Sequence, residues 1–414
     1  MKEKNYTLTK RACYFSYVSA ASCFALPALL FVTFNEMYGI SYALLGTLVL
    51  VNFVTQFTID MIFTLFSKHF NIRLTVRIMP LLTSLGLAVY ALSPFLFKGN
   101  EFFGLVIGTF IFSIAAGLGE VLISPIVAAV PSENPDRDMS FLHSLYAWGV
   151  LSVIIVSTLF FNIFGSENWM YLTLFFAALP IISHILFTIA PTPEMTLGVN
   201  TQGKKANSKK IGLALCFGCI FFGSAAENVM TNWISSYMEV AISIPKTYGD
   251  ILGMAVFALL LGFARTLYAK FGKNIYKVLM CGMVTAVICY LTAGLSSNVF
   301  LAFLACIVTG FATSLLWPGT LILMEEKIPN PGVAAYALLA AGGDFGASIA
   351  PQLMGIVVDT VKESSFGISL AEKMSLAPDQ IGMKAGMLVT AVFPVLGTIV
   401  LIIIGRYFSK KKSQ

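Results

Sequence analysis

Long apolar stretches alternate with short polar ones along the whole chain. A helix needs about 20 apolar residues to cross a hydrocarbon core about 30 Å thick, and the apolar stretches reach that length. Because such a core contains no water, the backbone must pair its polar groups within the helix itself. The pattern therefore predicts an all-α integral membrane protein with twelve transmembrane helices. We place them at residues 12–34, 41–66, 74–97, 102–130, 141–164, 168–190, 211–237, 248–269, 275–296, 299–324, 333–358 and 384–406. Prolines inside these segments indicate helix kinks, at Pro27, Pro80, Pro125, Pro318 and Pro351.

The basic residues are distributed unequally between the two sides of the predicted membrane. With the N-terminus inside, few of the 26 Lys and Arg fall in outer segments, namely Lys98, Lys246, Lys362, Lys373 and Lys384. Lys and Arg are enriched in cytoplasmic loops. We therefore expect both the N- and C-termini in the cytoplasm, an even number of spans, and a multi-pass protein of the bacterial plasma membrane.

Composition supports the membrane interpretation. The chain is 57% hydrophobic and 11% charged, whereas a soluble chain is about 25% charged. So few charges cannot cover a water-facing surface of this size. The net charge of +6 is spread over short patches between apolar stretches, which favours membrane topology over nucleic-acid binding.

Signatures of soluble enzymes are absent from the sequence. It contains no GxxxxGK[ST] loop, HExxH or GxSxG motif. The seven cysteines lie in or beside apolar stretches, including Cys216 and Cys219 at CxxC spacing, and are expected to pack as apolar side chains. We expect no enzyme activity, no cofactor and no metal site.

The chain divides around its longest internal hydrophilic stretch. Residues 191–210 are rich in Thr, Gly, Asn and Lys, so we expect a flexible cytoplasmic linker between six-helix bundles at 1–190 and 211–414. The two halves of the sequence resemble each other, because Pro125 in the fourth span has a counterpart in Pro318 in the tenth. We therefore predict two pseudo-symmetric bundles.

A carboxylate at bilayer depth is costly, so each one is a candidate functional residue. Glu120 lies deep in the fourth span, next to Gly119 and four residues before Ser124. We expect it to face a cavity and to bind substrate, a proton or both. The alternative is a structural hydrogen bond to a neighbouring helix.

Glu227 begins a polar stretch in the seventh span, followed by Asn228, Thr231 and Trp233. Hydroxyl-binding polar groups beside an indole are typical of a site for a sugar-like ligand. The alternative is polar packing between helices.

Asp60 in the second span shares one helical face with Asn52 and Gln56. We expect it to form a gating or loop-anchoring ion pair, with Arg265 in the eighth span as its counterpart. Asp344 in the eleventh span is a further candidate substrate contact.

Two of the remaining residues keep two interpretations each, and a third has one. His143, at the start of the fifth span, either titrates near neutral pH or forms a plain hydrogen bond. Trp317 either lines a cavity or packs. His184, in an apolar stretch, is expected to be structural.

Two six-helix halves, a basic linker and cytoplasmic termini resemble the major facilitator superfamily along essentially the full chain. Within it, residues 119–125 and 143–149 resemble the fucose permease branch, in which a glutamate stands five residues before a proline. The resemblance places Glu120 on the cavity glutamate of that branch and Tyr146 on a substrate-contacting position. One departure is Ala28, near the place where the branch has a proton-coupling aspartate.

These observations favour a secondary active transporter of a small polar solute, a sugar or sugar derivative, that works by alternating access with proton coupling through Glu120 and Glu227. The expected substrate contacts are Glu120, Tyr146, Glu227, Asn228, Thr231, Trp233 and Asp344. The alternatives are efflux of hydrophobic compounds, a non-transporting membrane receptor and a lipid-directed membrane enzyme. The expected partners are the substrate, protons and membrane lipids, and we expect a monomer.

Overall fold

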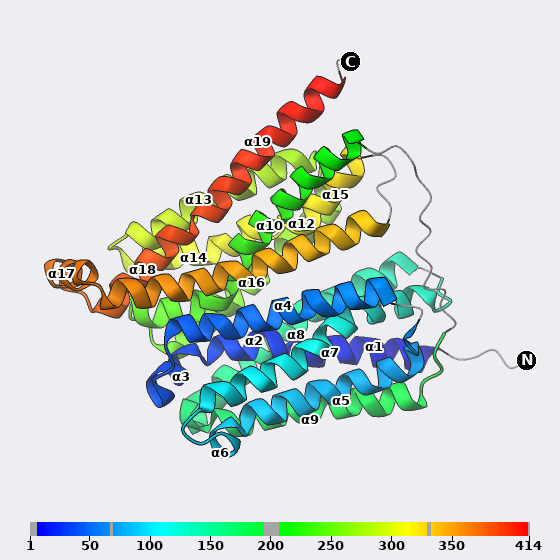
Figure 1. Cartoon of the computed structure of the whole chain (residues 1–414), viewed down its shortest axis with the longest axis horizontal. Coiled ribbons are helices and arrows are strands. Elements are labelled where there is room, and N and C mark those ends of the chain that lie inside the picture. Colours follow the sequence, from blue (N-terminus) through cyan, green and yellow to red (C-terminus); the bar gives the residue numbers. More distant parts are fainter. Residues whose placement is uncertain (1–5, 67–68, 134, 194–206, 329–332, 413–414) are drawn as a thin grey trace, which may run out of the picture. The chain divides into compact units, whose positions relative to one another are not determined.

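The computed structural model describes residues 6–66, 69–133, 135–193, 207–328 and 333–412. The chain forms two compact units. Unit 1 is Met1–Ile40 with Val51–Gly198, and unit 2 is Ser41–Leu50 with Val199–Gln414. Every regular element of the described residues is a helix (Figure 1), so the predicted all-α class is confirmed. Most of the predicted linker lies outside the described residues.

In unit 1, close backbone approaches hold neighbouring helices together. Its elements are α1 (Thr7–Ala20), α2 (Ser22–Leu29), α3 (Phe31–Tyr38), α4 (Tyr42–Phe66), α5 (Ile72–Ala91), α6 (Ser93–Leu96), α7 (Glu101–Ala129), α8 (Pro135–Phe164), the 3₁₀ turn η2 (Ser166–Asn168) and α9 (Trp169–Ile189). Helix α5 packs against both α7 and α9, and α1 packs against α8 and α9. A side chain at Gly108 would collide with the backbone of Tyr90, so this glycine lets α7 approach α5.

Unit 2 is built around α10. Its elements are α10 (Asn207–Ser236), η3 (Tyr237–Ala241), α11 (Lys246–Tyr248), η4 (Gly249–Ala255), α12 (Val256–Phe271), α13 (Ile275–Leu295), α14 (Val299–Thr313), α15 (Pro318–Lys327), α16 (Val333–Glu363), α17 (Ser365–Met374), α18 (Pro378–Thr390) and α19 (Val392–Lys412). Helix α10 packs against α16 and α19, α16 packs against α18, and α13 packs against α14 (Figure 1). The first turns of α4, up to Leu50, also belong to this unit.

Ten helical stretches of the described residues are long and apolar enough to cross a membrane, and they coincide with ten predicted spans. The other two predicted spans fall on α8 and α16, which are helices of 30 and 31 residues. The clearly apolar part of α8 is only Trp148–Phe164. The predicted total of twelve therefore stays a prediction.

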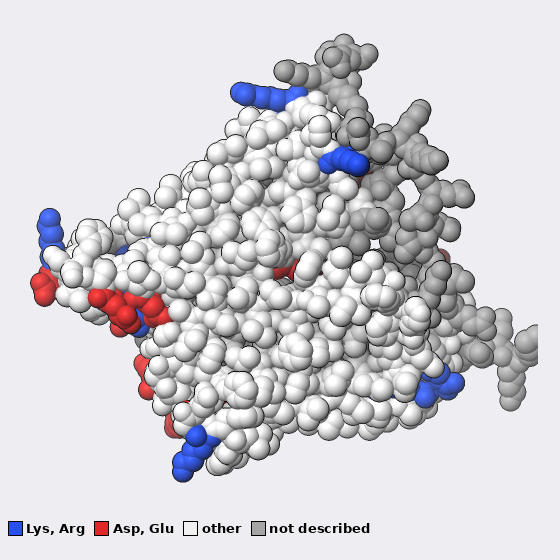
Figure 2. Space-filling view, viewed as in Figure 1, with Lys and Arg blue, Asp and Glu red and all other residues white. Residues whose placement is uncertain are grey.

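The surface of these helices matches a membrane environment. On the face shown in Figure 2, charged side chains lie mainly near helix ends, and the middle of the helices is almost free of them. Large apolar side chains are widely exposed, with Leu65, Ile163 and Ile189 each more than 65% accessible. Apolar patches of this extent indicate contact with lipid in a chain of this kind.

The first predicted span is a broken helix. It consists of α1, α2 and α3, separated at Ala21 and Leu30. At each break the N–H group bonds three residues back instead of four, Ala21 to the carbonyl of Val18 and Leu30 to that of Pro27. These tightened turns interrupt the regular α-helical hydrogen-bond pattern.

The other predicted kink positions behave in two ways. Pro80, Pro125 and Pro351 lie within α5, α7 and α16, which continue past them. Pro318 instead separates two helices, because α14 ends at Thr313 and α15 begins at Pro318.

Candidate functional site

Two carboxylates lie side by side in unit 1. Asp60 is on α4 and Glu120 is on α7, and an oxygen of each lies within 4.8 Å of the other. Asp60 is half-buried, and its Oδ1 atom has no hydrogen-bond partner among the described residues. Glu120 is exposed although it is deep within α7. Two ionised carboxylates repel each other at this distance, so the pair favours binding a proton or a cation.

A buried polar layer about two turns away holds α4 against α7. The Gln56 amide donates to Asn52 Oδ1 (3.0 Å), and Ser113 Oγ on α7 lies 2.7 Å from the same oxygen. Near Asp60 and Glu120 the two helices approach each other closely, because a Cβ atom at Gly117 of α7 would lie 3.0 Å from Ile59 of α4. The predicted polar face of α4 is thus split between helix packing, which uses Asn52 and Gln56, and the acidic pair.

Helix α1 brings a hydroxyl to the same place. Tyr17 is hydrogen-bonded to Ser124 on α7 and lies close enough to Glu120 for an electrostatic interaction. Tyr146 on α8 is 36% exposed, with its ring edge-on to Phe24 at 5.7 Å between centroids. Its exposed ring keeps surface available for a ligand.

In unit 2, a glutamate and an arginine face each other. Nη2 of Arg265 on α12 lies 3.3 Å from Oε1 of Glu227 on α10, and Glu227 Oε2 is buried without a hydrogen-bond partner among the described residues. Arg265 Nε also donates to the Ser314 carbonyl at 2.8 Å. A helix would satisfy that carbonyl from residue 318, but Pro318 has no N–H. The break between α14 and α15 therefore explains where Arg265 binds.

The polar stretch after Glu227 is turned partly inward. Asn228 and Thr231 are half-buried and bond to carbonyls one turn back, of Ser224 and Glu227 respectively. Trp233 is fully buried, and its indole N–H donates to the Pro351 carbonyl at 3.1 Å. In this conformation Trp233 therefore packs against α16 and has no surface for a ligand.

The remaining candidates have mixed surroundings. Asp344 is half-buried on α16. The indole of Trp317 packs against Gly343 of α16, because any side chain at Gly343 would collide with the indole nitrogen. His184 Nδ1 lies 2.7 Å from the Arg77 carbonyl, as expected of a structural histidine. The side chain of His143 lies outside the described residues.

Asp60 and Arg265, predicted to form gating or loop ion pairs, each lie beside a glutamate. Asp60 lies beside Glu120 and forms no ion pair with a basic side chain of the described residues, and Lys68 lies outside them. Arg265 forms its ion pair with Glu227. A gating role for either residue stays a prediction.

Sequence reasoning missed a buried carboxylate at the start of the eighth span. Asp250 is 1% exposed, accepts a hydrogen bond from Ser235 Oγ (2.5 Å) and lies 3.8 Å from Lys246. It lies on η4, a π-helical turn that faces a second one, η3. Such turns have no clear sequence signal, and Asp250 lies at the predicted boundary of the span, so nothing in the pattern distinguished it from a loop residue.

A second missed carboxylate binds the start of α4. Asp359 on α16 accepts the Ala43 N–H at 2.5 Å, and the Gln352 amide donates to the Ala43 carbonyl at 3.1 Å. Lys362 lies 3.2 Å from Asp359 and 3.3 Å from Asp379. Free N–H groups at a helix start attract a carboxylate, which explains why the first turns of α4 belong to unit 2.

Comparisons with known proteins agree with this fold. The sequence matches the family model described as Major Facilitator Superfamily over residues 13–351. No curated protein matches the chain. A bacterial homolog of the human lysosomal transporter Spinster has a similar structure, with 14% identity, a TM-score of 0.76, and coverage of 99% of this chain and 98% of that one.

Two sugar symporters have similar structures as well. The D-xylose–proton symporter is 14% identical with a TM-score of 0.74, covering 94% of this chain and 97% of that one. The Escherichia coli fucose–proton symporter is 12% identical with a TM-score of 0.60, covering 97% and 99%. These identities show a shared fold alone, and the predicted fucose permease branch is not confirmed.

Proposed function

Because the chain belongs to the major facilitator superfamily, we propose that it is a secondary active transporter of a small polar solute, a sugar or sugar derivative, driven by protons. It would have twelve transmembrane helices with both termini in the cytoplasm, in the plasma membrane of a bacterium. Transport would use alternating access of two six-helix halves to the two sides of the membrane.

The observation that carries the proposal is the pair formed by Asp60 and Glu120. Their oxygens lie within 4.8 Å of one another, and one Asp60 oxygen is buried and unpaired among the described residues. A proton shared by the pair removes the repulsion between two negative charges. Substrate binding that favours the protonated pair would then couple solute movement to proton movement.

Polar groups of unit 2 support a hydrophilic substrate. Glu227, Asn228 and Thr231 are half-buried on one helix, and Arg265 neutralises Glu227. Amide and hydroxyl groups in this arrangement suit the hydroxyls of a sugar. Tyr146 and Asp344 complete the proposed set of contacts, whereas Trp233 would contribute only if a different conformation exposed it.

The experiment begins with a thermal-stability screen of the purified protein in detergent. Monosaccharides, disaccharides, sugar acids and hydrophobic drugs are compared at two pH values, because a ligand that binds the native state raises its apparent melting temperature. Uptake of the stabilising solute is then measured in proteoliposomes with and without an inward proton gradient, for the wild type, Glu120→Gln and Asp60→Asn.

Both variants are expected to lose accumulation driven by the proton gradient while still binding the solute. Glu36→Gln is the matched control, because Glu36 is an exposed carboxylate of the same unit, and it should transport as the wild type does. Gradient-driven accumulation that persists undiminished in Glu120→Gln would refute the coupling role. Stabilisation by hydrophobic drugs but by no sugar would contradict the proposed sugar transport and favour efflux of hydrophobic compounds.

A further inference from the structure

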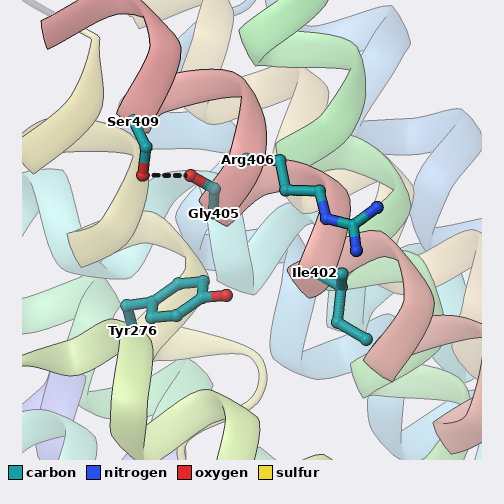
Figure 3. A pocket seen from close by; sticks show the side chains of 5 residues that line it. All are labelled: Tyr276, Ile402, Gly405, Arg406 and Ser409. Atoms are coloured by element: carbon teal, nitrogen blue, oxygen red, sulfur yellow. Dashed lines mark hydrogen bonds between the residues drawn. The ribbon is translucent and has the colours of Figure 1, made fainter. Parts of the chain in front are cut away.

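A cavity of about 470 Å³, largely open to the surroundings, lies between α13 and α19, and no candidate site residue lines it. Figure 3 shows the side chains around it, with Tyr276 projecting from α13 toward α19. The lining residues are Tyr276, Ile402, Gly405, Arg406 and Ser409. Cavities of this size accommodate small organic groups.

Internal hydrogen bonds fix most of this lining. The Tyr276 hydroxyl donates to the Leu401 carbonyl at 3.1 Å, and Ser409 Oγ donates to the Gly405 carbonyl at 2.7 Å. A side chain at Gly405 would collide with the Tyr276 hydroxyl, so the glycine keeps this wall in place. The tyrosine ring is therefore held as a rigid wall of the cavity.

Arg406 is the charged group of this cavity. It is exposed, and it forms no ion pair with any residue that the structure describes. A guanidinium binds phosphate through two parallel hydrogen bonds. The cavity therefore combines an apolar wall with an available cation that suits a phosphate group.

The position of Arg406 along the helix indicates whether the phosphate would come from a membrane lipid or from a soluble molecule. Helix α19 has no charged residue from Val392 to Gly405, Arg406 is its first, and Lys410, Lys411 and Lys412 follow. Helix α13 begins at Ile275, between Lys273 and Lys277. Both helices thus change from apolar to basic at the level of the cavity, as helices do at the headgroup region of a membrane.

The surface next to the cavity is apolar on one side and basic on the other. Ile399, Ile402 and Ile403 are each more than 40% exposed on α19. A water-soluble anion would gain nothing from this isoleucine surface, whereas the acyl chains of a lipid would cover it. The basic end of the helix attracts anionic headgroups.

We propose that this cavity binds the headgroup of an anionic phospholipid. The phosphate lies on the Arg406 guanidinium, the glycerol region fills the space beside Tyr276 and Ser409, and the acyl chains run along the exposed isoleucines. The site is independent of substrate and proton binding, so its failure and the failure of the proposed function are distinguishable.

The test is native mass spectrometry of the protein released from nanodiscs that contain phosphatidylglycerol and phosphatidylcholine. The wild type is expected to retain phosphatidylglycerol preferentially. Arg406→Gln is expected to lose this preference by about fivefold or more, the effect of one basic residue near the membrane surface. Arg406→Lys should retain part of it, because it keeps the charge and loses the paired hydrogen bonds.

Arg73→Gln is the matched control, because Arg73 is an exposed arginine on the first turn of α5 in the other unit. It should retain phosphatidylglycerol as the wild type does. Thermal denaturation in detergent checks that each variant is folded. Equal retention by the wild type and Arg406→Gln would overturn the proposal. So would equal loss in Arg73→Gln, or displacement of the lipid by soluble glycerol phosphate at matched concentration.

Discussion

The contact between Arg265 and the Ser314 carbonyl predicts an energetic coupling between Arg265 and Pro318. Arg265 Nε donates to that carbonyl at 2.8 Å in place of the N–H that Pro318 lacks. In the wild type, Arg265→Met leaves a carbonyl without its donor, which costs about 1–3 kcal/mol. In a Pro318→Ala background residue 318 supplies an N–H, so this part of the cost disappears.

A double-mutant cycle measures this coupling. For a unit of this size, about 1–3 kcal/mol corresponds to an apparent melting temperature difference of roughly 2–12 °C. Thermal unfolding in detergent can be followed with a thiol-reactive dye, because Cys219, Cys289 and Cys306 are buried and become accessible on unfolding. The loss of the Glu227 partner is the same in both backgrounds and cancels. Equal destabilisation by Arg265→Met in both backgrounds would refute the reasoning.

Two further predictions concern the contact of α16 with the start of α4. Gly355→Leu places a Cβ atom 2.2 Å from the Tyr42 carbonyl oxygen, so we expect a cost of about 1–3 kcal/mol from overpacking and a lower melting temperature. Gly262→Leu, which meets open space on α12, should leave the melting temperature unchanged or raise it, and an equal fall in both variants would contradict the packing argument. Burial lowers the pKa of Lys362, just beyond its predicted span, but Asp359 and Asp379 outweigh burial and raise the pKa overall. The stabilisation by Lys362 is therefore fully present below the unfolded pKa of about 10.4 and is lost as pH rises through the folded value. The melting temperatures of the wild type and Lys362→Met should differ by a constant amount from about pH 6 to pH 9 and converge only above about pH 10.4; convergence already near neutral pH would contradict this.

The spans were predictable because runs of about 20 apolar residues are a strong signal in a sequence. The break at Pro318 was predictable from the proline, but the breaks within the first span were not. Ala21 and Leu30 interrupt the first span through tightened hydrogen bonds, and nothing in their side chains distinguishes them from their neighbours. The π-helical turns η3 and η4 likewise depend on a hydrogen-bond register that composition does not determine.

For the candidate site, the sequence identified residues better than partners. Asp60 and Arg265 were recognised as unusual charges, but their neighbours Glu120 and Glu227 lie on other helices. Pairing between helices depends on how the helices rotate and pack, and a single sequence does not specify this. Asp359 was missed for a related reason, since its partner is a backbone N–H at the start of another helix.

The two units use a glutamate in opposite electrostatic settings. Glu227 faces Arg265, and the two charges neutralise each other without any further ligand. Glu120 faces Asp60, and the two like charges need a third, positive partner. The predicted repeat places Asp60 in the second span of its half and Arg265 in the second span of the other, so the charge is inverted at related positions. A proton relieves the repulsion within the unit 1 pair, whereas a proton on Glu227 would remove the attraction within the unit 2 pair. This asymmetry is why we assign proton coupling to Glu120 and substrate binding to the unit 2 pair.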